Sequence, residues 1–297
     1  MAKTVRPRHA WVTVLGVCIV FAVAPPSGLG KTRQPAPVTP GSRYLALGDS
    51  VTFGYEESTV VPPPNYKDAS SFPGYPEQFG DAQHVIVANA ACPGETSSSL
   101  INQNAPSNGC ENAPNSGVGY RTVFPLHVKY KGSQLAYALG YLRTHKNVRL
   151  VSLMIGANDY FLCLETTKDG CTSASEQQAV LKKIAANVRI ILSSIRNKAH
   201  YKGQLAIVHY YSLDYSSAAT NARSQALNGT VDTAAKPFHV KIADGYGELK
   251  AAVVHFGGST CGAGLLTQLG SPGKCGVHPS YAGQALLAQA LAKAVRF

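Results

Sequence analysis

Four short blocks of the sequence carry residue types that can act together in acyl transfer. Ser50 lies in "LGDSVTFGY", Gly94 in "NAACPGETS", Asn158 in "IGANDYF" and His278 in "GVHPSYAG". A serine hydroxyl becomes a strong nucleophile when a neighbouring base takes its proton, and His278 is the candidate base. The tetrahedral intermediate carries negative charge on oxygen, which N–H donors at Ser50, Gly94 and Asn158 could stabilise.

Each block also has a purely structural explanation. Gly-Asp-Ser fits a turn or a helix cap, and Gly-Ala-Asn-Asp fits a plain turn. We expect Asp49 and Asp159, which lie inside these blocks, to cap helices or to bind turn N–H groups rather than to react. The blocks become informative together, because each lies where a regular element of the fold is expected to begin or end.

Five apolar stretches are nearly continuous in Val, Ile, Leu and Ala, which is typical of strands buried on both faces of a parallel sheet. The stretches are residues 43–48, 84–91, 148–156, 204–212 and 238–246. Ligands of such sheets bind beyond the carboxyl ends of the strands. We therefore expect the four blocks to meet at one edge of the sheet.

Helical patterns between the strands complete an α/β arrangement. Residues 173–198 carry one apolar face and begin with Ser173 and Glu176, which fit a capping box. A last helix is expected from about Tyr281 to Val295. Strands that alternate with helices predict a doubly wound domain. Two long polar loops, residues 56–78 and 101–122, are expected to be functional or mobile.

Taken in order, the four blocks resemble those of the SGNH hydrolases, the Gly-Asp-Ser-type esterases and lipases, over most of residues 43–295. The resemblance implies a flavodoxin-like three-layer α/β/α sandwich with a mostly parallel sheet. It implies Ser50 as nucleophile, His278 as base, and Gly94 and Asn158 as oxyanion donors. It also implies carboxylic-ester substrates, no metal and no cofactor.

One position departs from this family pattern. The pattern usually reads Asp-x-x-His, but Cys275 stands at the position of the Asp. A backbone carbonyl can accept the Nδ1–H of a histidine and fix the same tautomer. Our hypothesis is that a Cys261–Cys275 disulfide holds the loop and that a carbonyl of this loop orients His278. Asp244 and Asp214 are the alternative acids, although both fit strand-end or helix-cap roles.

Apart from Cys18, the cysteines form an even set, which in an exported chain indicates disulfides. Sequential pairing is expected because each neighbouring pair brackets a loop rich in Gly, Pro and Asn. The expected pairs are Cys92–Cys110, Cys163–Cys171 and Cys261–Cys275. Their positions are also similar to those of the secreted subgroup of the family that has three disulfides. No C-x-x-C pair occurs, so zinc binding is not expected.

The N-terminal segment has the features of an export signal. Basic residues precede the apolar run "AWVTVLGVCIVFAVA", which is shorter than a typical membrane span. We expect a signal peptide at residues 1–30, a linker at 31–41 and a hydrolase domain at 42–297. The alternative is that the segment is not cleaved and anchors the protein at the cell surface.

The composition narrows the range of partners. The formal charge is +11 for the whole chain but +6 for residues 41–297, which gives only a weak preference for anionic substrates or surfaces. No Lys/Arg-rich run interleaved with aromatic residues indicates nucleic-acid binding. We therefore predict a secreted, monomeric serine esterase or lipase that acts on fatty acyl or other carboxylic esters and makes transient contact with lipid surfaces. The alternative is a catalytically impaired protein of this fold that binds lipids or glycans.

Overall fold

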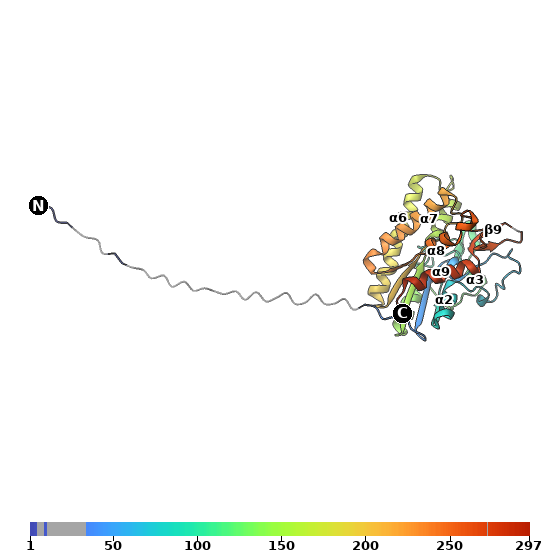
Figure 1. Cartoon of the computed structure of the whole chain (residues 1–297), viewed down its shortest axis with the longest axis horizontal. Coiled ribbons are helices and arrows are strands. Elements are labelled where there is room, and N and C mark those ends of the chain that lie inside the picture. The colour runs from blue at the N-terminus through green and yellow to red at the C-terminus, as the bar shows by residue number, and fades with distance from the viewer. Residues whose placement is uncertain (5–8, 11–33, 272) are drawn as a thin grey trace. The chain divides into compact units, whose positions relative to one another are not determined.

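A parallel sheet of five strands forms the centre of the unit Pro35–Phe297 (Figure 1). This computed structural model describes residues 1–4, 9–10, 34–271 and 273–297. The strands of the sheet are β1 (Arg43–Gly48), β2 (Ile86–Asn89), β5 (Val148–Met154), β6 (Gln204–Val208) and β7 (Lys241–Ala243). Their order is β2-β1-β5-β6-β7, which is the flavodoxin-like order. Each strand lies within one of the five stretches predicted from the sequence.

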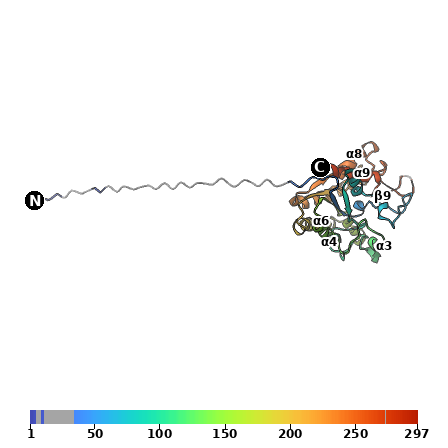
Figure 2. The ribbon, with the colours of Figure 1, turned by 90° about the horizontal axis from the view of Figure 1, so that it is seen from below.

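Helices cover both faces of the sheet and give the three layers that the resemblance implies (Figure 2). On one face α9 (Tyr281–Ala294) packs against α2 (Tyr75–Gln83) and α8 (Gly245–Ala252). On the other face α6 (Ala174–Ser193) packs against α7 (Ala218–Ala235) and α5 (Ala157–Thr166), beside α4 (Gln134–Thr144). Cover on both faces explains why all of β6 and nearly all of β1 are buried.

Short elements fill the connections between these layers. They are α1 (Ser50–Phe53), α3 (Tyr120–Val123), β3 (Asn112–Ala113), β4 (Gly117–Val118), β8 (Leu266–Gln268), β9 (Cys275–Pro279), η1 (Ala69–Ser71), η2 (Pro114–Ser116), η3 (Ser194–Lys198), η4 (Lys236–Phe238) and η5 (Val254–Phe256). The strands β8 and β9 form an antiparallel hairpin directly before α9. The turn from β1 into α1 and this hairpin carry the residues of the candidate site.

The start of α6 follows the sequence prediction in part. The Ser173 hydroxyl accepts the backbone N–H of Glu176, as a helix cap requires. The reciprocal half of a capping box is not formed, because the Ser173 N–H donates to Asp169 instead. The carboxylate of Glu176 accepts the Ser173 hydroxyl. Beyond Ser193 the helix continues as a π-helical turn, η3.

Three disulfides close the loops of the domain, in the pairs expected from the sequence. Cys92–Cys110 joins the turn after β2 to the second long loop, Cys163–Cys171 closes the end of α5, and Cys261–Cys275 holds the start of β9. Each disulfide that closes a loop of this size reduces the conformational freedom of the unfolded chain and contributes about 2–3 kcal/mol to stability.

The structure describes only part of the predicted signal peptide and linker. The expected signal peptide at 1–30 lies largely outside the described residues, as do residues 31–33 of the expected linker. Residues 35–41 belong to the folded unit. Val38 is buried there, and its N–H donates to the carbonyl of Arg296 at 2.8 Å. Within the part of the chain that the structure describes, no helix combines the length and apolarity needed to cross a bilayer.

Candidate active site

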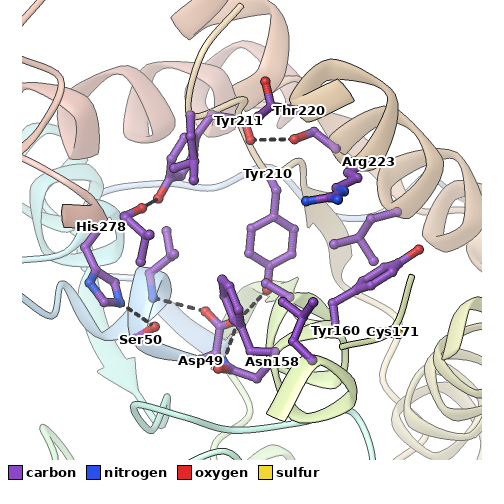
Figure 3. Close-up of a pocket in the computed structure, with 18 of the residues that line it drawn as sticks. Asp49, Ser50, Asn158, Tyr160, Cys171, Tyr210, Tyr211, Thr220, Arg223 and His278 are labelled. Atoms are coloured by element: carbon purple, nitrogen blue, oxygen red, sulfur yellow. Dashed lines mark hydrogen bonds between the residues drawn. The ribbon is translucent and has the colours of Figure 1, made fainter. Parts of the chain in front are cut away.

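Ser50 and His278 meet although they lie 228 residues apart in the chain. Ser50 is the first residue of α1, at the carboxyl end of β1, and His278 lies in β9. The Nε2 atom of His278 is 3.0 Å from the hydroxyl oxygen of Ser50 (Figure 3). This is hydrogen-bonding distance, so the imidazole can take the serine proton directly.

A carboxylate holds the other side of the imidazole. The Nδ1 atom of His278 is 2.8 Å from Oε1 of Glu57, in the loop that follows α1. The Val277 N–H donates to the same oxygen at 3.2 Å, and the Thr267 hydroxyl donates to Oε2 at 2.5 Å. Glu57 therefore binds both strands of the β8–β9 hairpin and ties that hairpin to the segment that carries Ser50.

The environment of Glu57 keeps this side chain ionised. Burial alone would raise its pKa, but the hydrogen bond and the charge of His278, together with the Thr267 hydroxyl, outweigh burial and lower the pKa to about 2. An ionised carboxylate at Nδ1 accepts the proton there. Nε2 is then left as the acceptor that faces Ser50.

The predicted orientation of His278 by a backbone carbonyl is wrong, because the Glu57 carboxylate occupies that position. The two alternative acids serve the structural roles that their positions suggested. Asp244 accepts the Gly247 N–H as the cap of α8, and Asp214 accepts the N–H and hydroxyl of Ser216.

Gly276 provides the space that Glu57 needs. A Cβ atom at this position would lie 2.0 Å from Oε1 of Glu57 and 2.5 Å from the Thr267 hydroxyl oxygen. Such distances are far below van der Waals contact, so a larger residue would displace the carboxylate. The hairpin can approach Glu57 closely because residue 276 has no side chain.

Asn158 lies at the start of α5 and lines the same pocket as Ser50 and His278. Its amide nitrogen donates to Oδ2 of Asp49 at 3.4 Å, and its oxygen accepts the Asn108 amide at 3.0 Å. Asp49 also accepts the Tyr210 hydroxyl and the Val51 N–H, so it caps α1 as expected. Burial raises the pKa of Asp49 to about 6, although these hydrogen bonds oppose the increase.

Asp159 has the structural role that the sequence predicts. Its carboxylate accepts the backbone N–H of Ser97 at 2.8 Å and the Ser97 hydroxyl at 2.7 Å. Burial raises the pKa of Asp159, and the two bonds from Ser97 counteract that effect. The side chain therefore fixes the turn after β2 against the start of α5.

Gly94 is hydrogen-bonded to Asn108 and is not among the described residues that line the pocket. Its φ angle is +81°, a conformation that favours glycine, and a Cβ atom there would lie 2.4 Å from the Asn108 carbonyl oxygen. Its own carbonyl accepts the Asn108 N–H at 2.8 Å. Gly94 thus connects to Asn158 through Asn108, and its role as an oxyanion donor stays a prediction.

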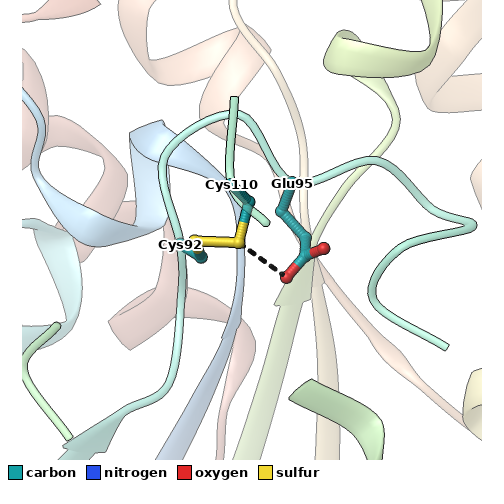
Figure 4. A group of neighbouring side chains, drawn as sticks. All are labelled: Cys92, Glu95 and Cys110. Atoms are coloured by element: carbon teal, nitrogen blue, oxygen red, sulfur yellow. Dashed lines mark hydrogen bonds between the residues drawn. A yellow bond between two sulfur atoms is a disulfide. The ribbon is translucent and has the colours of Figure 1, made fainter. Parts of the chain in front are cut away.

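A buried polar network lies beneath the turn that presents Ser50. The side chain of Gln134 accepts the Gly48 N–H at 2.6 Å and donates both to the Gly48 carbonyl and to Glu95. Burial raises the pKa of Glu95 well above its ordinary value. Glu95 lies beside Cys92 and Cys110 (Figure 4), but these sulfurs are bonded to each other and are not thiolate ligands.

The pocket beside Ser50 has a volume of about 200 Å³ and is lined mainly by apolar side chains (Figure 3). Its walls come from α1, α5, α6 and the segment before it, α7, the segment after β6, and β9. Several large apolar residues at the pocket are exposed, namely Phe161, Leu164, Leu213 and Val277. The pocket therefore offers an apolar site that is open to the surface.

Comparisons with known proteins show the family of the chain and solved structures that share its fold. Residues 46–286 match the GDSL-like Lipase/Acylhydrolase family. The chain is similar to phospholipase A1 from Streptomyces albidoflavus NA297, at 17% identity and a TM-score of 0.53 over 86% of this chain and 99% of that one. It is also similar to a catalytic mutant of an acetylxylan esterase from Geobacillus stearothermophilus, at 16% identity and a TM-score of 0.52 over 87% and 95% of the two chains. No curated protein sequence matches.

Replacing the acid tests its importance. We expect Glu57→Gln to lower kcat for ester hydrolysis by about 10²–10⁴-fold, because the imidazole loses its charged partner and its preferred tautomer. Glu56→Gln is the matched control, since Glu56 is the neighbouring acid. Its charge acts on Glu57 and His278, but its side chain makes no hydrogen bond within the described part of the chain. Steady-state kinetics on both variants, with circular dichroism to verify folding, provide the measurement. Equal activity of the two variants would contradict this role of Glu57.

Filling the space at residue 276 should displace the same carboxylate without removing it. We expect Gly276→Ala to lower kcat by about 10²-fold, since a misplacement of about 1 Å has that effect on catalysis. Gly140→Ala in α4 is the control, because nothing lies within 4 Å of a Cβ at that position. Unchanged kcat in Gly276→Ala would show that the close contact is not required.

The low pKa of Glu57 predicts that the wild-type protein and Glu57→Gln differ in how their stability changes at acid pH. Its pKa in the folded chain, about 2, is lower than the ordinary value of 4.5. A lowered pKa contributes stability above the unfolded value, and that contribution disappears as pH falls through the folded value. Between about pH 5 and pH 2, wild type should therefore lose more unfolding free energy than Glu57→Gln. Urea unfolding at several pH values measures this, and parallel pH profiles would refute it.

Proposed function

The chain belongs to the GDSL-like Lipase/Acylhydrolase family, and on this premise we propose that it hydrolyses carboxylic esters through Ser50, His278 and Glu57. The observation that carries the proposal is the unbroken hydrogen-bonded line from the serine hydroxyl through the imidazole to the carboxylate. Such a line is the arrangement by which a base activates a serine and an acid orients the base.

In the proposed mechanism, Nε2 of His278 takes the hydroxyl proton as Ser50 attacks the ester carbonyl carbon. Glu57 remains ionised and stabilises the imidazolium that forms, in keeping with its low pKa. The negative charge on the former carbonyl oxygen is held by the Ser50 N–H and the Asn158 amide, with the Gly94 N–H as the third donor. His278 then gives its proton to the departing alcohol.

In the second half of the reaction, water replaces Ser50 as the attacking group, and Ser50 replaces the alcohol as the leaving group. A water molecule gives a proton to His278 and attacks the acyl-enzyme carbonyl, and the same donors hold the second oxyanion. Collapse of this intermediate breaks the bond to the Ser50 oxygen, which takes the proton back from His278. The acid product leaves, and the protein is ready for another ester.

The apolar pocket supports a fatty acyl or similarly apolar substrate group. The exposed apolar side chains at the pocket, among them Phe161 and Leu164, support the transient contact with lipid surfaces. The three disulfides support secretion, because such bonds persist in oxidising compartments. Glu57 weighs against a catalytically impaired binding protein, since it supplies the acid that the sequence pattern lacks.

Removing the nucleophile tests the proposal. Ser50→Ala should lower hydrolysis of 4-nitrophenyl butyrate by about 10⁴–10⁶-fold and abolish labelling by a fluorophosphonate probe. Ser224→Ala is the matched control, because Ser224 lines the same pocket but donates its hydroxyl to the Tyr211 carbonyl. Activity and labelling that persist in Ser50→Ala would overturn the proposed function.

A further inference from the structure

A basic side chain lies across the pocket from the catalytic residues. Arg223 is part of α7, and in Figure 3 its guanidinium points inward, on the opposite side from Ser50 and His278. Among the described residues that line this pocket, the basic ones are Arg223 and His278. The part of the site that is remote from the serine therefore carries a positive charge.

Arg223 has no partner that neutralises this charge. Within the described residues, no ion pair or hydrogen bond involves its guanidinium. The carboxyl group that lines the pocket, Asp49, is buried and already accepts bonds from Tyr210, Val51 and Asn158. Arg223 is exposed, so solvent screens its charge, but without a counter-ion the guanidinium remains able to attract and bind an anion.

A second free donor lines the same pocket. The Tyr160 hydroxyl makes no hydrogen bond with any residue that the structure describes, and Arg223 acts electrostatically on this group. Neighbouring hydroxyls differ, because Thr220 donates to the Asp214 carbonyl and Ser224 donates to the Tyr211 carbonyl. Arg223 and Tyr160 thus both carry donor groups at the pocket that a ligand could still engage.

We infer that Arg223 and Tyr160 form a subsite for an anionic group of the substrate, a phosphate or a carboxylate. The inference rests on the proposed function for the position of the ester, which lies at Ser50. Apolar lining residues, such as Leu227, contact the part of the substrate between its two ends. The substrate class is therefore an amphiphilic ester with a negative charge at a distance from the scissile bond.

Direct binding tests the subsite without relying on catalysis. Isothermal titration calorimetry compares hexyl phosphate, hexanoate and 1-hexanol as ligands of the full chain. We expect at least one anion to bind about tenfold more tightly than 1-hexanol, and Arg223→Gln to remove most of that difference. Arg223→Lys should retain part of it, and Tyr160→Phe should weaken anion binding severalfold. Arg143→Gln, an exposed arginine at the end of α4, is the control for net charge.

The outcomes distinguish a phosphate from a carboxylate as the anionic group. They also distinguish failure of the subsite from failure of the proposed ester hydrolysis. A preference for hexyl phosphate assigns a phosphate-bearing substrate, and a preference for hexanoate assigns a carboxylate. Equal binding of 1-hexanol, or anion binding unchanged in Arg223→Gln, would overturn the inference. Ser50→Ala should bind the anions as wild type does. If Ser50→Ala keeps esterase activity while anion binding depends on Arg223, the proposed function fails and the subsite stands.

Discussion

The hydrogen bond between Glu57 and His278 is the interaction on which the candidate site depends. It joins two segments that are 221 residues apart and sets the tautomer of the imidazole. The same carboxylate accepts the Val277 N–H and the Thr267 hydroxyl, so it also fixes the β8–β9 hairpin. Without this carboxylate, the hairpin would keep its disulfide but lose its polar link to the segment after Ser50.

The loop that carries Glu57 is held by aromatic packing. Phe53, Phe72 and Tyr120 form a buried cluster, with Tyr55 and Tyr66 packed against it. The Tyr55 ring lies 4.9 Å from the His278 ring, centroid to centroid, in an edge-on arrangement that favours aromatic contact. The start of the long loop is therefore half-buried against this cluster, which restricts the positions that the Glu57 side chain can take.

The sheet could be predicted from the sequence because strands buried on both faces must be apolar throughout. The same reasoning located Ser50, Asn158 and His278, since each adjoins the end or start of an apolar element. Glu57 could not be found this way, because acids in a polar loop normally remain solvated and no local spacing connects Glu57 to His278. The positive φ angle of Gly94 explains the glycine but does not show where its N–H points.

Two tasks that a single aspartate could perform are divided between two groups in this chain. At position 275 an acid would both stabilise the imidazolium and help to order the turn before His278. Here the Cys261–Cys275 disulfide orders the turn covalently, and Glu57 provides the charge from another loop. Because Glu57 closely follows Ser50 in the chain, the proposed acid and the proposed nucleophile belong to one continuous segment. The relative positions of Ser50, His278 and Glu57 then depend on one contact, that of the hairpin with this segment.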